Sequence, residues 1–425
     1  MAKIVTKKRP LAEWFSIFMF LYPFMLSTIL QLLRLPSMMK YLMDAAWCMV
    51  LLLTLSKEKI RLSRKLMPFT CVIGIFLLYT VVVYLFNYQS GIYYLWGFRN
   101  NFRYYVAFLA FSMYLQENDA KKLVELTDKL FWLNAVVSLF QFFVMGYRQD
   151  YLGGLFGVER GCNGASLLFF ILVISKSLLS YMNGQERIMS CFLKSGTAMI
   201  IAAMAEIKFF FLIYVIILLL ASLLTRFSFR KFWMIFISIF LLSMGSTLLV
   251  SIFGAKVRLS FEFLLELITA KSYASRTDLG RFTVISVLSN RILTTWPMRL
   301  FGLGLGNCET SSFAICNTPF FQQYQSLHYT WFTSACLYLE TGYLGMAIYL
   351  SFFMVSFIQA FRTVKAGTAN QLFCQLAMIM AILCMILTFY NSSLRIEAGY
   401  IAYFVLALPY VRKNTTETIV IVQRR

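Results

Sequence analysis

His328 is the only histidine of the 425-residue chain, and its surroundings are polar. It lies in the sequence QQYQSLHYT, directly before a helical pattern that carries Trp331 and Phe332. An imidazole accepts a proton near neutral pH, so this histidine is a candidate general base that activates a hydroxyl group. The alternative is a structural histidine. A metal site is not supported, because the segment offers no second histidine and no nearby pair of carboxylates.

Arginines are frequent in the long segment that contains His328 and in a second segment, residues 146–165. The residues concerned are Arg258, Arg276, Arg281, Arg291 and Arg299 around the histidine, and Arg148 and Arg160 before residue 165. The predicted spans place both segments outside the cytoplasm, where basic residues are unusual. They could contact lipid headgroups or pair with Glu262, Glu266 and Asp278. Alternatively they bind an anionic substrate, because the guanidinium fork matches the oxygens of a diphosphate.

Glu206 and Lys208 interrupt the apolar stretch 191–224. Each apolar flank has about 15 residues, which is shorter than a full membrane crossing. A charge at the centre of a membrane helix costs about 2.5–3.5 kcal/mol, so such residues pair with each other or face a wet cavity. The pair could therefore satisfy itself at the surface. In the other interpretation Lys208 lines a cavity and meets a lipid-linked phosphate, and Glu206 orients it.

The composition shows what kind of scaffold must position these residues. The chain is 60% hydrophobic and only 13% charged, with a mean hydropathy of +0.73. Apolar runs of about 20 residues recur along its length, which predicts an all-α polytopic membrane protein. The net charge of +21 fits short basic loops that anchor one face to the cytoplasmic leaflet. No basic and aromatic module stands apart from the apolar segments, so a nucleic-acid partner is not expected.

The apolar segments predict about 12 transmembrane helices, with both termini in the cytoplasm. The expected spans are 11–33, 37–55, 67–87, 103–116, 130–146, 165–182, two short spans within 191–224, 232–253, 342–361, 369–390 and 397–411. The stretch 191–224 is divided because one helix of that length would measure about 50 Å, against a hydrocarbon core of about 30 Å. The basic cluster at 225–231 then falls in the cytoplasm with the others. The N-terminus lacks the pattern of a cleaved signal peptide.

The domain organisation follows from these spans. We expect a membrane domain over 1–253 and 342–413, a cytoplasmic tail over 414–425, and one long external catalytic loop over 254–341. The loop contains helical patterns at 260–268 and 282–293 that are too short or too polar to cross a membrane.

Four smaller segments complete the sequence prediction. We expect 328–341 to form an external helix at the membrane interface, with a thirteenth span as the alternative. The aromatic segment 88–103 is expected to be a loop at the headgroups, and 117–129 a polar cytoplasmic connection. Cys308 and Cys316 both lie in the long loop, where a disulfide is one possibility if that face is oxidising.

Arg281 of LGRFTVIS is followed about 20 residues later by the glycines of WPMRLFGLGLGN and then by HYTWFTSACLYLETGYLG. The order of these motifs resembles the O-antigen ligase and polymerase superfamily. The sequence GGLFGVERGCNGAS resembles the segment before the sixth span of that family, and AEIKFFFLIY resembles its short turn with a cation. The glycines of GLGLGN lack the strand–turn–helix frame of a dinucleotide site, so a flexible turn is their simplest interpretation.

The resemblance implies a metal-independent glycosyltransferase without a cofactor. Such an enzyme takes a glycan from undecaprenyl diphosphate at the outer face of the bacterial inner membrane. His328 would activate the acceptor hydroxyl. The cations assigned to the diphosphate are Arg281 and Lys208, with Arg160 and Arg276 as further candidates, and the supporting carboxylates are Glu206 and Glu340. Preorganised cations are the groups that best stabilise the charge that develops on a diphosphate.

The same resemblance leaves alternatives within and outside this class. Family ligases have asparagine after the histidine, whereas this chain has Tyr329, which favours a polymerase of O-antigen or capsular repeat units over a ligase. A ligase would transfer glycan to lipid A core or to protein. A flippase for lipid-linked oligosaccharides should show internal repeats and charges at several mid-membrane positions, which this chain lacks. The expected partners are the lipid-linked oligosaccharide and membrane lipids, with a chain-length regulator and a flippase as candidates.

Overall fold

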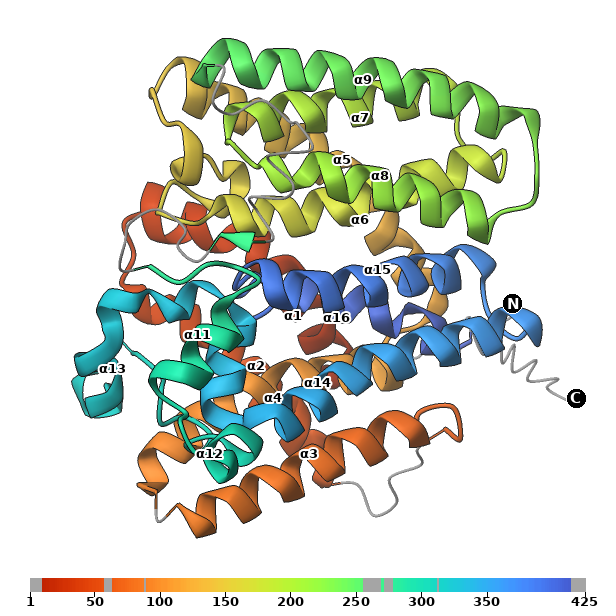
Figure 1. The fold of residues 1–425 in the computed structure, drawn as a ribbon. Coiled ribbons are helices and arrows are strands. Elements are labelled where there is room, and N and C mark those ends of the chain that lie inside the picture. The colour runs from red at the N-terminus through yellow and green to blue at the C-terminus, as the bar shows by residue number, and fades with distance from the viewer. Residues whose placement is uncertain are drawn as a thin grey trace, which may run out of the picture.

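The computed structural model describes residues 10–56, 63–87, 89–254, 269–270, 278–311 and 313–413. All its named elements are helical, and long helices lie side by side and run back and forth between two ends of the molecule (Figure 1). We call the end that holds Ser27, Asn163 and Tyr390 the cavity end. The opposite end, which holds Tyr114 and Lys365, is called the distal end. The predicted all-α class is confirmed for the described residues.

The long helices follow one another with alternating direction. The first group is α1 (Leu11–Ser27), α2 (Leu42–Leu55), α3 (Met67–Phe86), α4 (Gly91–Tyr114), α5 (Glu117–Phe143) and α6 (Asn163–Met182). The second is α7 (Ile188–Met204), α8 (Lys208–Leu224), α9 (Phe229–Phe253), α14 (Thr333–Lys365), α15 (Gln371–Tyr390) and α16 (Gly399–Ala407). A described helix therefore overlaps each of the twelve predicted spans, and 191–224 forms two helices with a turn between them, as expected.

Six of these segments are long and apolar enough to cross a membrane: Met38–Leu55, α3, α6, α9, α14 and α15. The most apolar window of α6 is completely buried among its neighbours, whereas only 22% of the corresponding window of α3 and of α9 is buried. Apolar helices that leave most of their side chains unburied are typical of a membrane protein, where lipid covers them. The count of twelve crossings stays a prediction, because the remaining helices are shorter or more polar.

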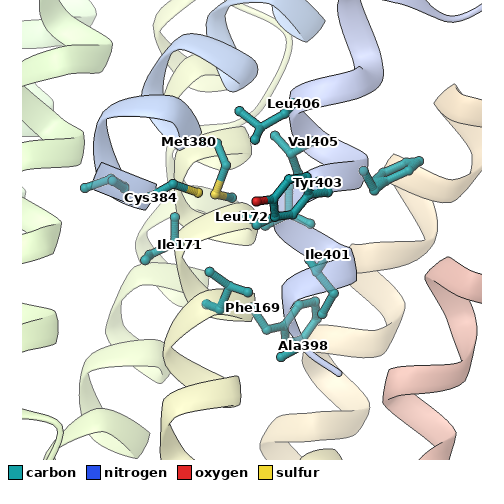
Figure 2. Close-up of a cluster of buried hydrophobic side chains, with 14 of the residues drawn as sticks. Phe169, Ile171, Leu172, Met380, Cys384, Ala398, Ile401, Tyr403, Val405 and Leu406 are labelled. Atoms are coloured by element: carbon teal, nitrogen blue, oxygen red, sulfur yellow. The ribbon is translucent and has the colours of Figure 1, made fainter. Parts of the chain in front are cut away.

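The core lies where α6, α15 and α16 meet. Figure 2 shows Phe169 and Leu172 of α6 beside Met380 of α15 and Tyr403 and Val405 of α16. Each of these side chains is less than 2% exposed. This central layer connects the two halves of the helix bundle.

Two predicted connections are helical instead. α4 begins at Gly91, so most of the aromatic segment 88–103 is part of that helix. Its polar residues Asn101 and Arg103 lower the hydropathy of the segment, yet both are buried against other helices. α5 begins at Glu117 and includes the polar segment 117–129, because Ala120, Leu123, Val124 and Thr127 form a buried stripe at helical spacing. Only the loop expected over 88–103 is contradicted, because hydropathy alone ignores polar helix faces. The position of that segment at the headgroups and the cytoplasmic side of 117–129 stay predictions.

The helix predicted at 328–341 begins at Thr333. It forms the first part of α14 (Thr333–Lys365), whose second part contains the predicted tenth span. A kink at Gly342, with a φ of +62°, separates the two parts. The loop itself holds the short helices α11 (Val284–Arg291), α12 (Trp296–Phe301) and α13 (Pro319–Tyr324). α11 confirms the helical pattern at 282–293, whereas 260–268 lies outside the described residues.

Candidate functional site

A cavity of about 800 Å³ lies at the cavity end of the bundle. Its walls come from the last turns of α1, the first turns of α4 and α6, the α7–α8 turn, the end of α15 and the segment 391–398. Five arginines line it: Arg99, Arg103, Arg160, Arg281 and Arg395. Five acidic residues line it as well: Asp150, Glu159, Glu206, Glu309 and Glu397. We call it the arginine cavity.

Three of the arginines are held by carboxylates. The guanidinium of Arg99 donates to Asp44 of α2 at 2.7 and 3.1 Å. The guanidinium of Arg395 forms an ion pair with Glu309. Arg103 is 2% exposed and pairs with Glu397 at 3.4 Å, and it also donates to the carbonyl of Arg395 at 2.8 Å. These pairs satisfy the charges and link α2, α4 and the segment after α15 into one wall.

Arg281 enters the cavity from the long loop. Its guanidinium donates from Nη1 to the carbonyl of Tyr390 at 2.9 Å and lies 4.1 Å from the centre of the Tyr390 ring. That ring stacks in turn on Phe209 of α8 at 3.8 Å. The loop, α15 and α8 therefore fix the orientation of this guanidinium. The structure places Arg281 in the arginine cavity. Its contact with a diphosphate stays a prediction.

Arg160 is the arginine of the cavity with the most open surroundings. It is exposed, and its guanidinium lies 4.9 Å from the centre of the Trp331 ring. No carboxylate of the described residues lies within ion-pairing distance of it. A guanidinium over an aromatic ring keeps its N–H donors available to other groups, because they point outward in the plane of the guanidinium. Arg160 is therefore well placed to bind an anion that enters the cavity.

His328 lies one aromatic ring away from the cavity. Its imidazole stacks on Trp331, a cavity-lining residue, with 4.2 Å between ring centres and an interplanar angle of 16°. Its Nδ1 is 2.7 Å from Oδ1 of Asp278, and the histidine side chain is 40% exposed while the aspartate is only 3% exposed. A carboxylate only accepts, so Nδ1 carries the proton and Nε2 is left to accept another. Nε2 is the atom that a general base requires.

Local backbone geometry holds this pair together. His328 has a φ of +50° and joins two short 3₁₀ turns, Gln325–Leu327 and Tyr329–Trp331. The N–H of Leu279 donates to the carbonyl of Leu327 at 3.4 Å, which aligns the neighbours of Asp278 and of the histidine. Non-glycine residues with positive φ are uncommon and cluster at functional sites. The chain therefore bends sharply at the histidine and presents its ring beside Trp331.

Glu206 and Lys208 form an ion pair at 3.0 Å in the α7–α8 turn. Glu206 lines the arginine cavity, whereas Lys208 is not among the lining residues. The structure thus brings the carboxylate to the cavity and turns the predicted phosphate contact, the lysine, toward its neighbour. Glu206 also has a φ of +52°, which marks the tightness of this turn.

Glu340 has a structural position behind the site. It is buried in α14, and its Oε1 accepts the N–H of Cys308 at 3.3 Å. The turn of GLGLGN is fixed to the same helix, because Leu303 and Gly304 donate to the carbonyls of Leu339 and Glu340 at 2.8 and 2.9 Å. The segment predicted as a flexible turn is therefore hydrogen-bonded to α14 on one side.

Two further predictions are settled or lie outside the structure. Cys308 and Cys316 are both buried and both have free thiols, so they form no disulfide in this structure. Arg276, the remaining predicted phosphate contact, lies outside the described residues. Among the residues that are described, no group of three histidine, cysteine or acidic side chains could hold a metal ion.

Several residues of the site were not identified from the sequence. Arg99 and Arg103 lie four positions apart on α4, which places both on one face of that helix. Arg395 lies in the short turn NSSLRIE, and Glu309 directly follows Cys308 in the long loop. The signal available in the sequence was the presence of arginines inside or between apolar segments. Asp278 lies 50 positions before the histidine, so no local pattern joins the two.

Comparisons with known proteins add no assignment. The chain matches no protein-family model and no curated protein.

Proposed function

We propose that the protein is a membrane glycosyltransferase that polymerises oligosaccharide repeat units carried on undecaprenyl diphosphate. The proposal includes twelve membrane crossings and places the reaction at the outer face of the bacterial inner membrane, where O-antigen or capsule is assembled. The observation that carries it is an arginine-lined cavity beside a histidine whose Nδ1 is held by a buried aspartate. The arginines suit an anionic leaving group, and the imidazole suits a proton acceptor. Glycosyl transfer from a diphosphate needs both.

The reaction can be written on these groups. The acceptor hydroxyl oxygen attacks the anomeric carbon of the donor sugar and passes its proton to Nε2 of His328. The bond between that carbon and the diphosphate oxygen breaks, and the electron pair leaves with the oxygen. Arg160 and Arg281 stabilise the negative charge that develops there. Asp278 stabilises the imidazolium that forms and holds the ring in place.

A ligase would use the same steps with a different acceptor. Tyr329 is buried and donates its hydroxyl to the carbonyl of Cys308 at 2.7 Å. It therefore stabilises the loop and does not line the arginine cavity. The preference for a polymerase rests on the resemblance described above.

A flippase is the alternative from another class. It too would need a cavity for a diphosphate. It would have no use for an imidazole that a buried carboxylate holds with Nε2 available as an acceptor. This pair favours an enzyme.

The decisive experiment uses a deletion strain complemented with wild type or with His328→Ala. Surface polysaccharide is resolved on a gel, and the amount of protein in the membrane is measured alongside. We expect the variant to yield single repeat units without the ladder of longer chains. Full-length ladders would show that the histidine is structural. Loss of all surface repeat units, with carrier-linked units retained inside the cell, would support the flippase instead.

A matched pair of variants tests the cavity. Arg160→Ala removes an arginine that lines it, and Arg148→Ala makes the same change in the same loop outside it. A hydrogen bond to a charged group contributes about 1.5–3 kcal/mol, so we expect an increase of about 10- to 100-fold in the KM for the lipid-linked donor with Arg160→Ala only. Equal effects of both variants would remove Arg160 from the proposed site.

A further inference from the structure

A second, smaller cavity lies at the distal end of the bundle, away from the arginine cavity. Its volume is about 310 Å³, near the lower limit of pockets that hold small ligands. The walls come from the turn before α3, the α4–α5 junction, the α14–α15 turn and the segment after α16. We call it the distal pocket.

Three cations line the distal pocket: Lys65, Arg412 and Lys413. The ammonium of Lys65 donates one of its three hydrogens to Thr368 at 2.7 Å and retains two others. Glu117 is the acidic residue among the described lining, and its carboxylate is paired with Lys121 at 3.0 Å. The pocket therefore keeps an excess of positive charge.

Two backbone hydrogen bonds fix the chain around the distal pocket. The N–H of Arg412 donates to the carbonyl of Leu115 at 3.0 Å, and the N–H of Glu117 donates to the carbonyl of Arg412 at 2.8 Å. These two bonds attach the chain after α16 to the α4–α5 junction. Arg412 and Lys413 are thereby held at the mouth of the pocket.

Uncharged polar side chains in the lining add donors for a ligand. Ser63, Thr368 and Asn370 line the distal pocket beside the cations. The hydroxyl oxygen of Thr368 accepts from Lys65, so its own hydrogen is left for an acceptor in the pocket. A ligand rich in acceptor oxygens would satisfy these groups.

We propose that the distal pocket binds a phosphate group, carried either by an anionic phospholipid headgroup or by a free phosphate ion. The cations and the Thr368 hydroxyl of the lining match the oxygens of a phosphate. Leu66, Met113 and Phe373 add apolar surface beside the polar groups, which suits a lipid. The proposal is independent of the proposed glycosyltransferase function and is tested separately from it.

The test uses full-length protein in detergent and two double variants of equal charge. Lys65→Gln with Arg412→Gln changes the pocket, while Lys122→Gln with Lys365→Gln changes two cations of the same end that do not line it. Native mass spectrometry measures the retention of phosphatidylglycerol against phosphatidylcholine with the same acyl chains. Thermal unfolding in inorganic phosphate, against chloride at equal ionic strength, measures binding of the free ion.

For a headgroup site we expect the pocket variant to bind phosphatidylglycerol at least tenfold more weakly, while the control stays within twofold of wild type. For a free-ion site, phosphate raises the unfolding temperature of wild type and of the control but not of the pocket variant. Thr368→Val removes a hydroxyl of the lining while keeping the shape of the side chain, and should weaken whichever ligand binds about fivefold. Equal losses in both double variants, or no binding of either probe by wild type, would overturn the proposal.

Discussion

In the proposed reaction the imidazole of His328 acts as a base in the orientation that Asp278 maintains. Asp278→Asn keeps the shape of the side chain but removes the negative charge that stabilises the imidazolium, so we expect the rate of polymerisation to fall at least about tenfold, a loss of about 1.4 kcal/mol. The measurement is the initial rate of chain extension by purified protein with a lipid-linked repeat unit. An unchanged rate would show that Asp278 stabilises the loop and does not support proton transfer by the histidine.

Cys162 lines the arginine cavity, but its thiol is expected to react slowly with electrophiles. Burial, and secondarily the charge of Asp150, raises the pKa of its thiol to about 12, and the thiol donates to the carbonyl of Gly157 at 3.2 Å. A pKa of about 12 leaves about one molecule in ten thousand as thiolate at pH 8, and the thiolate is the reactive form.

We therefore expect no labelling of Cys162 by a maleimide at pH 8 in the native protein, and full labelling after denaturation. Peptide mass spectrometry of the labelled protein makes this measurement. A variant with an accessible cysteine in the same loop, Arg148→Cys, serves as the positive control. Rapid native labelling of Cys162 would mean that the first turn of α6 opens to solvent.

At the scale of elements, the kink of α14 and the end of α12 depend on two glycines in close contact. A Cβ atom at Gly342 would lie 2.4 Å from the backbone of Leu300, and the φ of +62° is itself unfavourable for other residues. Gly302 faces the backbone of Glu340 in the same way at 2.5 Å. This contact fixes the end of α12 in the long loop against the kink of α14, the helix that follows His328.

Gly342→Ala should therefore lower the unfolding temperature, since the strain of a left-handed residue costs about 1–3 kcal/mol before the clash is counted. Gly74→Ala is the matched control, because Gly74 lies inside α3 with no atom within 4 Å of an added Cβ. Alanine is the better helix former there by about 0.5–1 kcal/mol, so that variant should be at least as stable as wild type. Thermal unfolding in detergent compares the two, and equal stability would contradict the packing described here.

The long apolar helices could be predicted because a membrane helix is encoded by composition over about 20 residues. The starts of α4 and α5 could not, because Arg103 and Asp128 depress the hydropathy while their partners, Glu397 and Lys176, lie far away in sequence. The same limit applies to the site. Histidine and arginine were recognisable by type, but the pairing with Asp278 depends on a fold that joins distant segments.

Across the whole molecule, arginines occur at both ends, whereas lysines are more frequent at the distal end. The arginine cavity is lined by five arginines and one lysine, Lys40. The distal turns carry lysines, among them Lys65, Lys122 and Lys365, together with arginines such as Arg362 and Arg412. Basic loops favour the cytoplasmic side. This distribution agrees with the proposed orientation, in which the distal end faces the cytoplasm and the cavity faces outward.

α5 is one of the helices on which the number of membrane crossings depends. Its first half is charged, yet Asp128 pairs with Lys176 at 2.7 Å and with Lys194 at 3.0 Å. Both lysines are buried, so these ion pairs connect α5 to α6 and α7. A helix stabilised in this way can cross a membrane despite its composition.

Reporter fusions after Gln116 and Tyr147, the two ends of α5, test this arrangement. With twelve crossings, a fluorescent protein fused after Gln116 should fluoresce in the cytoplasm, and alkaline phosphatase fused after Tyr147 should be active outside. If only the six long apolar segments crossed, α5 would not separate these positions and both reporters would indicate the same side. Fusions after Gly184 and Ile207 repeat the comparison across α7, another helix outside those six. Reporters on one side in both pairs would place α5 and α7 outside the set of crossing helices, and the arginine cavity would then need a different route to a lipid-linked substrate.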